Sequence, residues 1–304
     1  MTEATTLRLG EAIELGHALM QHDATGRGIR VLFIKGPAMH RHGLRGERVS
    51  TDIDVLVEPA RFGEFCDAAI ESGWRERPGS FISRRTTLHS RTFVREGWPC
   101  DLDVHGYFPG FLADPSTVFD ALWERRESMA FAHHDCDIPD RVGGLLILAL
   151  HCLRGASIER RHADELEQLV RVDLTAAERA DAASLALATG SAATLETVLP
   201  RLGIEATPPG DELKSAALRE WRERVAAGSH GAYFWLRAFR EARWSERPTI
   251  VWRAVWPTRR DLLTGRPETV DTVAGRVRAR AARWARGVRS APGGVAAIWG
   301  QRRG

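Results

Sequence analysis

The sequence has almost no lysine, few cysteines and no long apolar run. Its only lysines, Lys35 and Lys214, stand against 41 arginines in 304 residues, so each lysine calls for a specific explanation. No apolar run reaches the roughly 18 residues that a helix needs to cross a bilayer, which predicts that there is no transmembrane segment. The N-terminal stretch MTEATTLRLGEAIELG carries acidic residues where a signal peptide would have an apolar core. We therefore expect a cytoplasmic protein.

The cysteines also exclude two kinds of scaffold. There are four of them, widely spaced and without a CxxC pair: Cys66, Cys100, Cys136 and Cys152. A structural zinc site or a disulfide framework would need closer, patterned spacing. Reduced thiols are the expectation.

Charge is distributed unevenly along the chain. The net charge is +3, but residues 237–304 hold 16 arginines against five acidic residues, a net +11, so residues 1–236 carry −8. The hydrophobic fraction of 43% and the charged fraction of 27% are typical of a globular protein. The length favours more than one domain. The basic C-terminal part is a candidate for contact with an anionic partner.

Residues 31–57 combine two features of phosphate chemistry. Residues 31–34 form an apolar run of strand length, and Gly36-Pro37 then opens a short basic helix, where proline is favoured at the first position. A second strand at residues 51–57 alternates so that Asp52 and Asp54 share one face. A helix start that binds phosphate would thus lie near a pair of carboxylates.

The rest of the chain is predicted to be mostly helical after a few more strands. We expect strands near residues 81–83, 89–94 and 100–105, and helices at residues 5–24, 60–72, 116–127, 140–154, 162–172, 175–189 and within 211–241. In the third of these strands Asp101, Asp103 and His105 share one face. The hairpin before it can bring a third carboxylate to the first two.

Three carboxylates in this arrangement suit magnesium chemistry. They can hold two divalent ions about 3.5–4 Å apart, which polarise the attacking and leaving oxygens of a phosphoryl displacement. Carboxylates are also the oxygen ligands that Mg²⁺ prefers. The competing interpretation is a solvated strand face, which is the commoner situation for an isolated Asp-x-Asp. The neighbouring motifs favour the metal site.

These motifs resemble a known family. The segment IKGPAMHRHGLRGERVSTDIDVLV followed by CDLDVHG resembles the uncharacterised nucleotidyltransferases of the polymerase-beta superfamily. In that family a Lys-Gly strand end, an Arg before Asp-Ile-Asp-Leu-Leu-Val and a later Val-Asp-Leu-His recur. The resemblance continues more weakly through IPDRVGGLLILALHCLRG and RHADELEQL, and covers about residues 25–170.

The resemblance implies an α+β fold and a reaction. An N-terminal mixed-sheet nucleotidyltransferase domain would occupy residues 1–110, a helical domain residues 111–206, and an Arg/Trp-rich helical region with a flexible tail residues 207–304. The implied reaction is Mg²⁺-dependent transfer of a nucleoside monophosphate from an NTP such as ATP to an unidentified acceptor, with release of pyrophosphate. The implied catalytic and metal-binding residues are Asp52, Asp54 and Asp103. The implied nucleotide-binding residues are Lys35, Gly36, Arg48 and Ser50.

Some alternatives stay open. Asp101 competes with Asp103 for the third position, and we prefer Asp103 because it matches the family's Asp-x-His pattern; His105 is interpreted as a supporting residue. Pro37 stands where the superfamily commonly has serine, so Lys35, Arg48 or Ser50 would have to compensate. The acceptor can be a small molecule, peptide, protein or RNA, the last two as in a toxin-like enzyme. The chain can also be a non-catalytic module that binds nucleotide or nucleic acid.

The basic tail contains an expected amphipathic helix at residues 270–288. Apolar residues recur there at helical spacing, and arginines cover the remainder. Such a helix can lie on an anionic membrane, bind nucleic acid or contact an acidic partner. We favour a simpler interpretation, in which the helix packs on the acidic first part of the chain.

Overall fold

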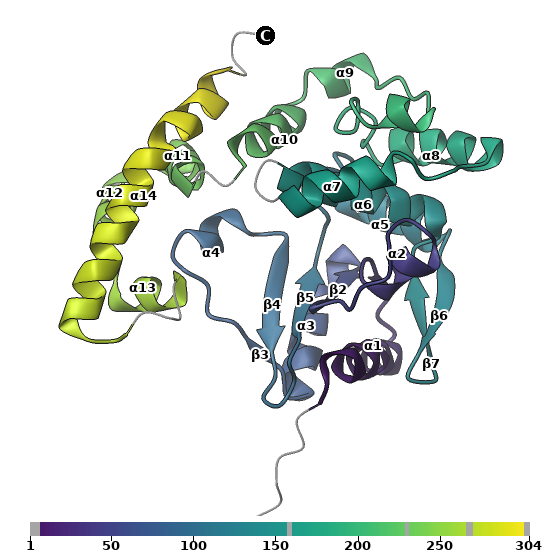
Figure 1. The fold of residues 1–304 in the computed structure, drawn as a ribbon, viewed down its shortest axis with the longest axis horizontal. Coiled ribbons are helices and arrows are strands. Elements are labelled where there is room, and N and C mark those ends of the chain that lie inside the picture. Colours follow the sequence, from purple (N-terminus) through teal and green to yellow (C-terminus); the bar gives the residue numbers. More distant parts are fainter. Residues whose placement is uncertain (1–6, 157–159, 229–230, 266–269, 301–304) are drawn as a thin grey trace, which may run out of the picture. The chain divides into compact units, whose positions relative to one another are not determined.

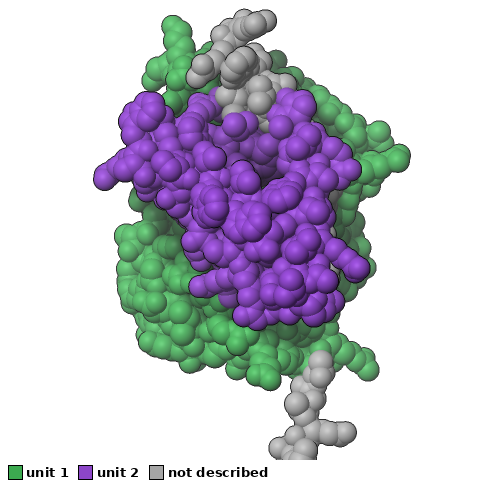
Figure 2. Space-filling model, turned by 90° about the vertical axis from the view of Figure 1, so that its left-hand side faces the viewer, with its two compact units in different colours: residues 1–77, 89–221 green, residues 78–88, 222–304 purple. Residues whose placement is uncertain are grey.

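The structure, a computed structural model, describes residues 7–156, 160–228, 231–265 and 270–300 (Figure 1). The chain divides into two compact units (Figure 2). Unit 1 contains residues 1–77 and 89–221, and unit 2 contains residues 78–88 and 222–304. A short segment from the first third of the chain therefore belongs to the same unit as the C-terminal helices. The three-domain division at residues 110 and 206 stays a prediction.

Unit 1 is built on a mixed five-stranded sheet with the order β1-β2-β5-β4-β3. The strands are β1 (Val31–Phe33), β2 (Asp52–Val57), β3 (Arg75–Glu76), β4 (Ser90–Val94) and β5 (Asp101–His105). β2 and β5 are parallel, and the other neighbours are antiparallel. With many helices around this sheet, the α+β class is confirmed.

The apolar face of the sheet is covered by α1 (Leu9–Gly26) and α3 (Phe62–Glu71). Gly16 of α1 lies so close to β2 that a Cβ there would be 2.2 Å from the side chain of Ile53. Ile53 and Val55 are fully buried. Since side chains alternate along a strand, the aspartates of β2 lie on the opposite face.

After the sheet comes a β-hairpin, which the sequence did not predict. The helix expected at residues 116–127 ends earlier, as α5 (Pro115–Trp123), and β6 (Glu127–Phe131) then pairs with β7 (His134–Ile138). The two turn residues, Ala132 and His133, have φ of 46° and 62°. Turns of this hand normally use Asn-Gly or a similar pair, so the usual sequence signal for the hairpin is absent.

Short and long helices complete unit 1. They are η1 (Pro59–Arg61), α2 (Pro37–Arg41), α6 (Arg141–Ala156), α7 (Arg160–Leu169), α8 (Ala176–Ala188), η2 (Leu199–Leu202), α9 (Gly210–Leu213) and α10 (Ala216–Ala227), the last of which continues into unit 2. The apolar run in α6 is fully buried from residue 145 to residue 148. The buried helix expected at residues 140–154 is therefore confirmed.

Unit 2 contains α4 (Ser83–Thr86), α11 (Gly231–Glu241), α12 (Arg247–Val255), α13 (Arg259–Gly265) and α14 (Val273–Gly300). The prediction of a strand near residues 81–83 is wrong, because this segment forms a turn and the start of α4. Phe81 stacks on Trp235 with ring centroids 5.9 Å apart, and its N–H donates to Asp261 at 2.8 Å. These partners lie far along the sequence, so local alternation could not reveal them.

All four cysteines are buried and free. Within the described ranges, no helix combines the length and the hydrophobicity that crossing a bilayer would require.

Candidate metal and nucleotide site

The register between two parallel strands brings the aspartates together. Asp52 of β2 is paired with Asp101 of β5, and Asp54 with Asp103. Because neighbouring strands in register present the same face, all four carboxylates lie on the face opposite α1 and α3. Potential ligand atoms of Asp54, Asp103 and His105 lie within 4.8 Å of one another. This cluster has the chemical groups to hold a metal ion.

Asp54 is the centre of the cluster and carries two partners on one oxygen. Its side chain is 2% exposed, and Oδ1 lies 2.6 Å from Lys35 Nζ and 3.0 Å from His105 Nε2. Burial acts to raise the pKa of Asp54, but Lys35 and His105 outweigh burial and hold that pKa below its usual range. Asp54 is therefore a buried, ionised carboxylate.

The other two carboxylates are less well compensated. Burial and the charge of Asp54 raise the pKa of both Asp52 and Asp103. Asp103 Oδ1 is buried and has no hydrogen-bond partner among the residues that the structure describes. Burial of such an oxygen destabilises the fold unless a cation or a hydrogen-bond donor contacts the oxygen. The donor set thus fits a divalent cation.

Asp101 faces a different environment from Asp103. Its Oδ1 accepts from Arg77 at 2.6 Å, and its side chain is one-third exposed. Asp103 lies in the cluster and Asp101 lies beside it, neutralised by an arginine. The preference for Asp103 as the third carboxylate stays a prediction, and the two aspartates differ in their partners as described.

Gly36 and Ser50 lie beside the cluster. Gly36 has φ +68° and ψ −135°, a conformation that side chains with a Cβ avoid, and a Cβ there would meet Ser50 Oγ at 3.5 Å. Ser50 Oγ in turn donates to the backbone oxygen of Asp52 at 2.9 Å. Two of the expected nucleotide-binding residues therefore adjoin Asp52. The helix that follows, α2, has only five residues, so its dipole is small.

Arg48 pairs with an acidic residue outside the carboxylate cluster. Its Nη1 is 3.7 Å from Oε1 of Glu165 on α7, and Arg45 Nε is 3.0 Å from the same oxygen. Glu165 is itself buried. Arg48 therefore contributes to a contact between the loop before β2 and α7, whereas Lys35 contacts the carboxylates.

Two histidines near the cluster were not predicted as site residues. The ring of His151 on α6 lies 4.8 Å from the ring of His162 on α7, centroid to centroid. Burial, together with the charges of Lys35 and Arg154, lowers the pKa of His151 to about 2. Gly155 makes room for the pair, since a Cβ there would lie 1.6 Å from His162 Nδ1. In the sequence, the glycine in the last turn of this apolar helix was the one sign that another side chain packs there.

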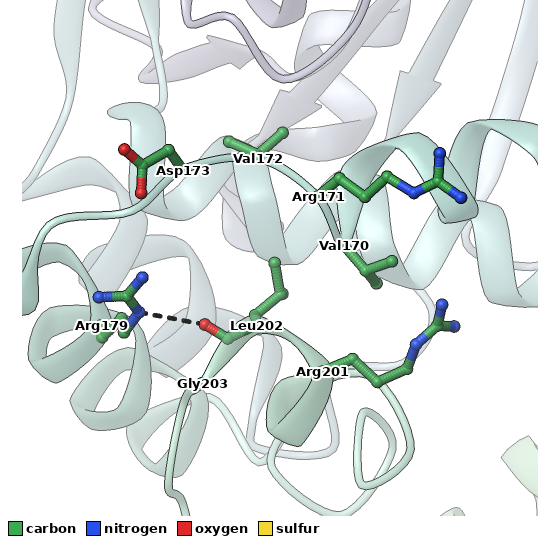
Figure 3. A pocket seen from close by; sticks show the side chains of 8 residues that line it. All are labelled: Val170, Arg171, Val172, Asp173, Arg179, Arg201, Leu202 and Gly203. Carbon is green, nitrogen blue, oxygen red and sulfur yellow. Dashed lines mark hydrogen bonds between the residues drawn. The ribbon is translucent and has the colours of Figure 1, made fainter.

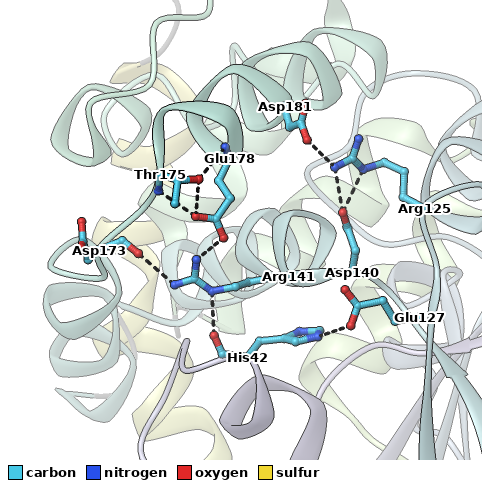
Figure 4. Close-up of polar contacts among 9 residues, drawn as sticks. All are labelled: His42, Arg125, Glu127, Asp140, Arg141, Asp173, Thr175, Glu178 and Asp181. Atoms are coloured by element: carbon cyan, nitrogen blue, oxygen red, sulfur yellow. Dashed lines mark hydrogen bonds and ion pairs between the residues drawn. The ribbon is translucent and has the colours of Figure 1, made fainter.

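A polar network fixes α2 and the start of α6 (Figure 4). Arg141 donates to the backbone oxygens of His42 at 2.8 Å and Asp173 at 2.9 Å, and also pairs with Glu178. Glu178 closes a capping box with Thr175 at the start of α8. The segment after Gly36 is thereby tied to two helices far along the chain.

An open pocket lies elsewhere in unit 1 (Figure 3). It has a volume of about 540 Å³ and includes Arg171, Arg179 and Arg201 in its lining. Arg179 donates to the backbone oxygen of Leu202 at 3.2 Å, and Arg201 pairs with Glu167 at 2.8 Å. The pocket shares no residue with the carboxylate cluster.

Comparison with known proteins gives matches among solved structures alone. No protein-family model matches the chain, and no curated protein matches it. Among solved structures, the chain is similar to the crystal structure of an antigenic nucleotidyltransferase-like protein from Paracoccidioides brasiliensis. The TM-score is 0.38 and the sequence identity 10%, over 67% of this chain and 98% of that chain. At this level of similarity, the function has to be inferred from the carboxylate cluster itself.

Proposed function

We propose that this protein is a Mg²⁺-dependent nucleotidyltransferase that moves a nucleoside monophosphate from an NTP to an acceptor and releases pyrophosphate. One observation carries the proposal: Asp52, Asp54 and Asp103 lie on one face of two parallel strands in register. Asp103 Oδ1 is also buried without a hydrogen-bond partner in the described ranges. Excess carboxylate at a buried site is what a divalent cation would balance.

The roles follow from the contacts of each residue. Asp54 and Asp103 would hold the metal from inside the cluster, and Asp52 from its rim. When bound, the metal would supply positive charge to the phosphates and polarise the bond that breaks. Lys35 keeps Asp54 ionised and oriented. Gly36 and Ser50, which adjoin Asp52, would let the triphosphate come close to the backbone and bind there.

The test is transfer of label from each α-labelled NTP to a component of a cell lysate in the presence of Mg²⁺. Asp54→Asn and Asp103→Asn should lower transfer by at least about a hundredfold, because each removes a charged metal ligand. Asp101→Asn is the matched control, since Asp101 occupies the same strand face but pairs with Arg77. Its transfer should stay close to that of the parent.

Metal binding gives a second readout that does not need an acceptor. Mn²⁺ binding, followed by electron paramagnetic resonance, should be lost in Asp54→Asn and Asp103→Asn and kept in Asp101→Asn. Equal transfer and equal Mn²⁺ binding by all four proteins would overturn the proposal. Far-ultraviolet circular dichroism of each variant establishes that the fold is intact.

The Lys35–Asp54 ion pair favours one other candidate function. An ammonium 2.6 Å from Asp54 Oδ1 already supplies a positive charge at the centre of the cluster. A protein with this pair can bind a nucleotide without transferring it, with Lys35 taking the place of a metal. Mg²⁺-independent NTP binding by the parent, with no labelled product from any NTP, would favour this candidate.

A further inference from the structure

Unit 2 exposes an apolar face on two of its helices. We call it the tryptophan face, and it consists of Trp252 and Val255 on α12, Trp256 directly after α12, and Val277, Trp284 and Val288 on α14. Trp252 is 63% exposed and Val288 is 74% exposed. The rings of Trp252 and Trp256 lie 6.4 Å apart, and those of Trp256 and Trp284 lie 6.0 Å apart. The face is therefore continuous from one helix to the other.

Helix α14 exposes its large apolar residues, whereas two of its arginines pack on aromatic rings of unit 2. Its apolar residues Val277, Trp284 and Val288 follow one another at helical spacing and are exposed. Two of the arginines between them pack within unit 2: Arg280 lies over the ring of Trp256 at 4.8 Å and Arg283 over the ring of Trp235 at 5.1 Å. The helix is held within unit 2 by these two arginines, by the buried Ala279 and by the hydrogen bond that Trp284 Nε1 donates to the backbone oxygen of Val255 at 2.7 Å. Large exposed apolar surfaces of this kind mark sites of interaction.

The charge around the tryptophan face is strongly positive. Unit 2 has 20 arginines against six acidic residues in its sequence, a net +14. Arg278 and Arg289 are exposed on α14 beside Val277 and Val288. An interacting surface that offers both aliphatic groups and positive charge needs a partner with an apolar layer and a negative outer layer.

We propose that the tryptophan face docks on the surface of an anionic lipid bilayer, with α14 lying in the plane of the interface. Indole rings and valines would enter the boundary between headgroups and acyl chains, and the arginines would meet the anionic headgroups. A nucleic acid fits less well. Single strands stack bases on aromatic rings and pair phosphates with cations, which leaves the exposed valines without a role.

The test uses the full chain and two vesicle populations, phosphatidylcholine alone and phosphatidylcholine mixed with phosphatidylglycerol. We expect sedimentation with the anionic vesicles and a blue shift of tryptophan fluorescence, both reduced as ionic strength rises. The triple variant Val277→Ser/Trp284→Ser/Val288→Ser should bind the anionic vesicles about tenfold or more weakly, because the inserted surface is removed. Leu187→Ser is the matched control: Leu187 is 41% exposed in unit 1, and its variant should bind as the parent does.

A second variant separates charge from insertion. Arg278→Gln/Arg289→Gln leaves the apolar residues in place and should lower binding to anionic vesicles severalfold, with a smaller salt dependence. The proposal is overturned if the parent does not sediment with anionic vesicles, or if the triple variant binds them equally well. It is also overturned if the face proves to be taken by single-stranded RNA, a second copy of the chain or the acidic part of the same chain. Oligonucleotide titration, sedimentation velocity and cross-linking report these three outcomes.

Discussion

Replacement of Lys35 by methionine gives the sharpest test of how the carboxylate cluster is balanced. The Lys35 side chain is 12% exposed and the Asp54 side chain 2%, and the two are 2.6 Å apart. Removal of one partner from a buried pair costs about 3–5 kcal/mol, because the remaining charge is left without compensation. His105 still donates to the same oxygen at 3.0 Å, so we expect the lower end, about 3 kcal/mol.

Divalent cations should reverse part of this loss. A metal bound only by the folded state stabilises it by about 2.7 kcal/mol when its concentration is a hundred times Kd. In the parent the ion has to displace the Lys35 ammonium from Asp54 Oδ1, whereas in Lys35→Met only His105 contacts that oxygen. Mg²⁺ or Mn²⁺ should therefore stabilise the variant more than the parent. Urea unfolding in EDTA and then in excess metal measures both effects.

Lys214→Met is the matched control, because Lys214 is the only other lysine and is exposed. Its free energy of unfolding should stay within about 0.5 kcal/mol of the parent, with the same response to metal. The reasoning fails if Lys35→Met is as stable as Lys214→Met in EDTA. It also fails if the metal stabilises Lys35→Met no more than the parent.

Two further predictions concern stability. Burial lowers the pKa of His17 from 6.5 to about 4, so the folded state takes up fewer protons than the unfolded chain and the parent should lose about 2 kcal/mol between pH 7 and pH 5. In urea unfolding, the free energy of unfolding of His17→Phe should fall by about 2 kcal/mol less than that of the parent between pH 7 and pH 5. The exposed control His22→Asn should keep the pH dependence of the parent. The lowered pKa of His17 is contradicted if His17→Phe keeps it too, or if His22→Asn loses it equally. Arg141→Ala should cost about 2–3 kcal/mol in urea unfolding, because three partners lose a charged donor. Arg201→Ala, which breaks only the exposed pair with Glu167, should cost under about 1 kcal/mol, and equal losses would contradict the role of Arg141.

Strands β1, β2 and β5 were predictable because their sequences carry the information locally. Alternation in β2 fixed which face Asp52 and Asp54 share, and the short hairpin before β5 required that strand to return nearby. Burial of β1 followed from an uninterrupted apolar run. In each case the pattern lies within a few residues of the element that it specifies.

The features that the sequence did not predict depend on distant partners or on unusual turn residues. The β6–β7 hairpin turns through Ala132 and His133, neither of which is a normal residue for a positive φ. His162 lies against His151 only because Gly155 leaves space for it. The contact of Arg48 with Glu165 spans more than a hundred residues. No periodicity or local motif encodes such contacts.

The balance of charge in the cluster explains why its carboxylates point to function. Asp52, Asp54 and Asp103 share the region with one ammonium, that of Lys35, and burial with mutual repulsion raises the pKa of two of the three. If the site were purely structural, an amide or an apolar side chain at one of these positions would make the folded state more stable, since uncompensated buried charge destabilises a fold. Perturbed carboxylates of this kind are concentrated at functional sites. A divalent cation has the charge that the cluster lacks and the preference for oxygen that its carboxylates satisfy.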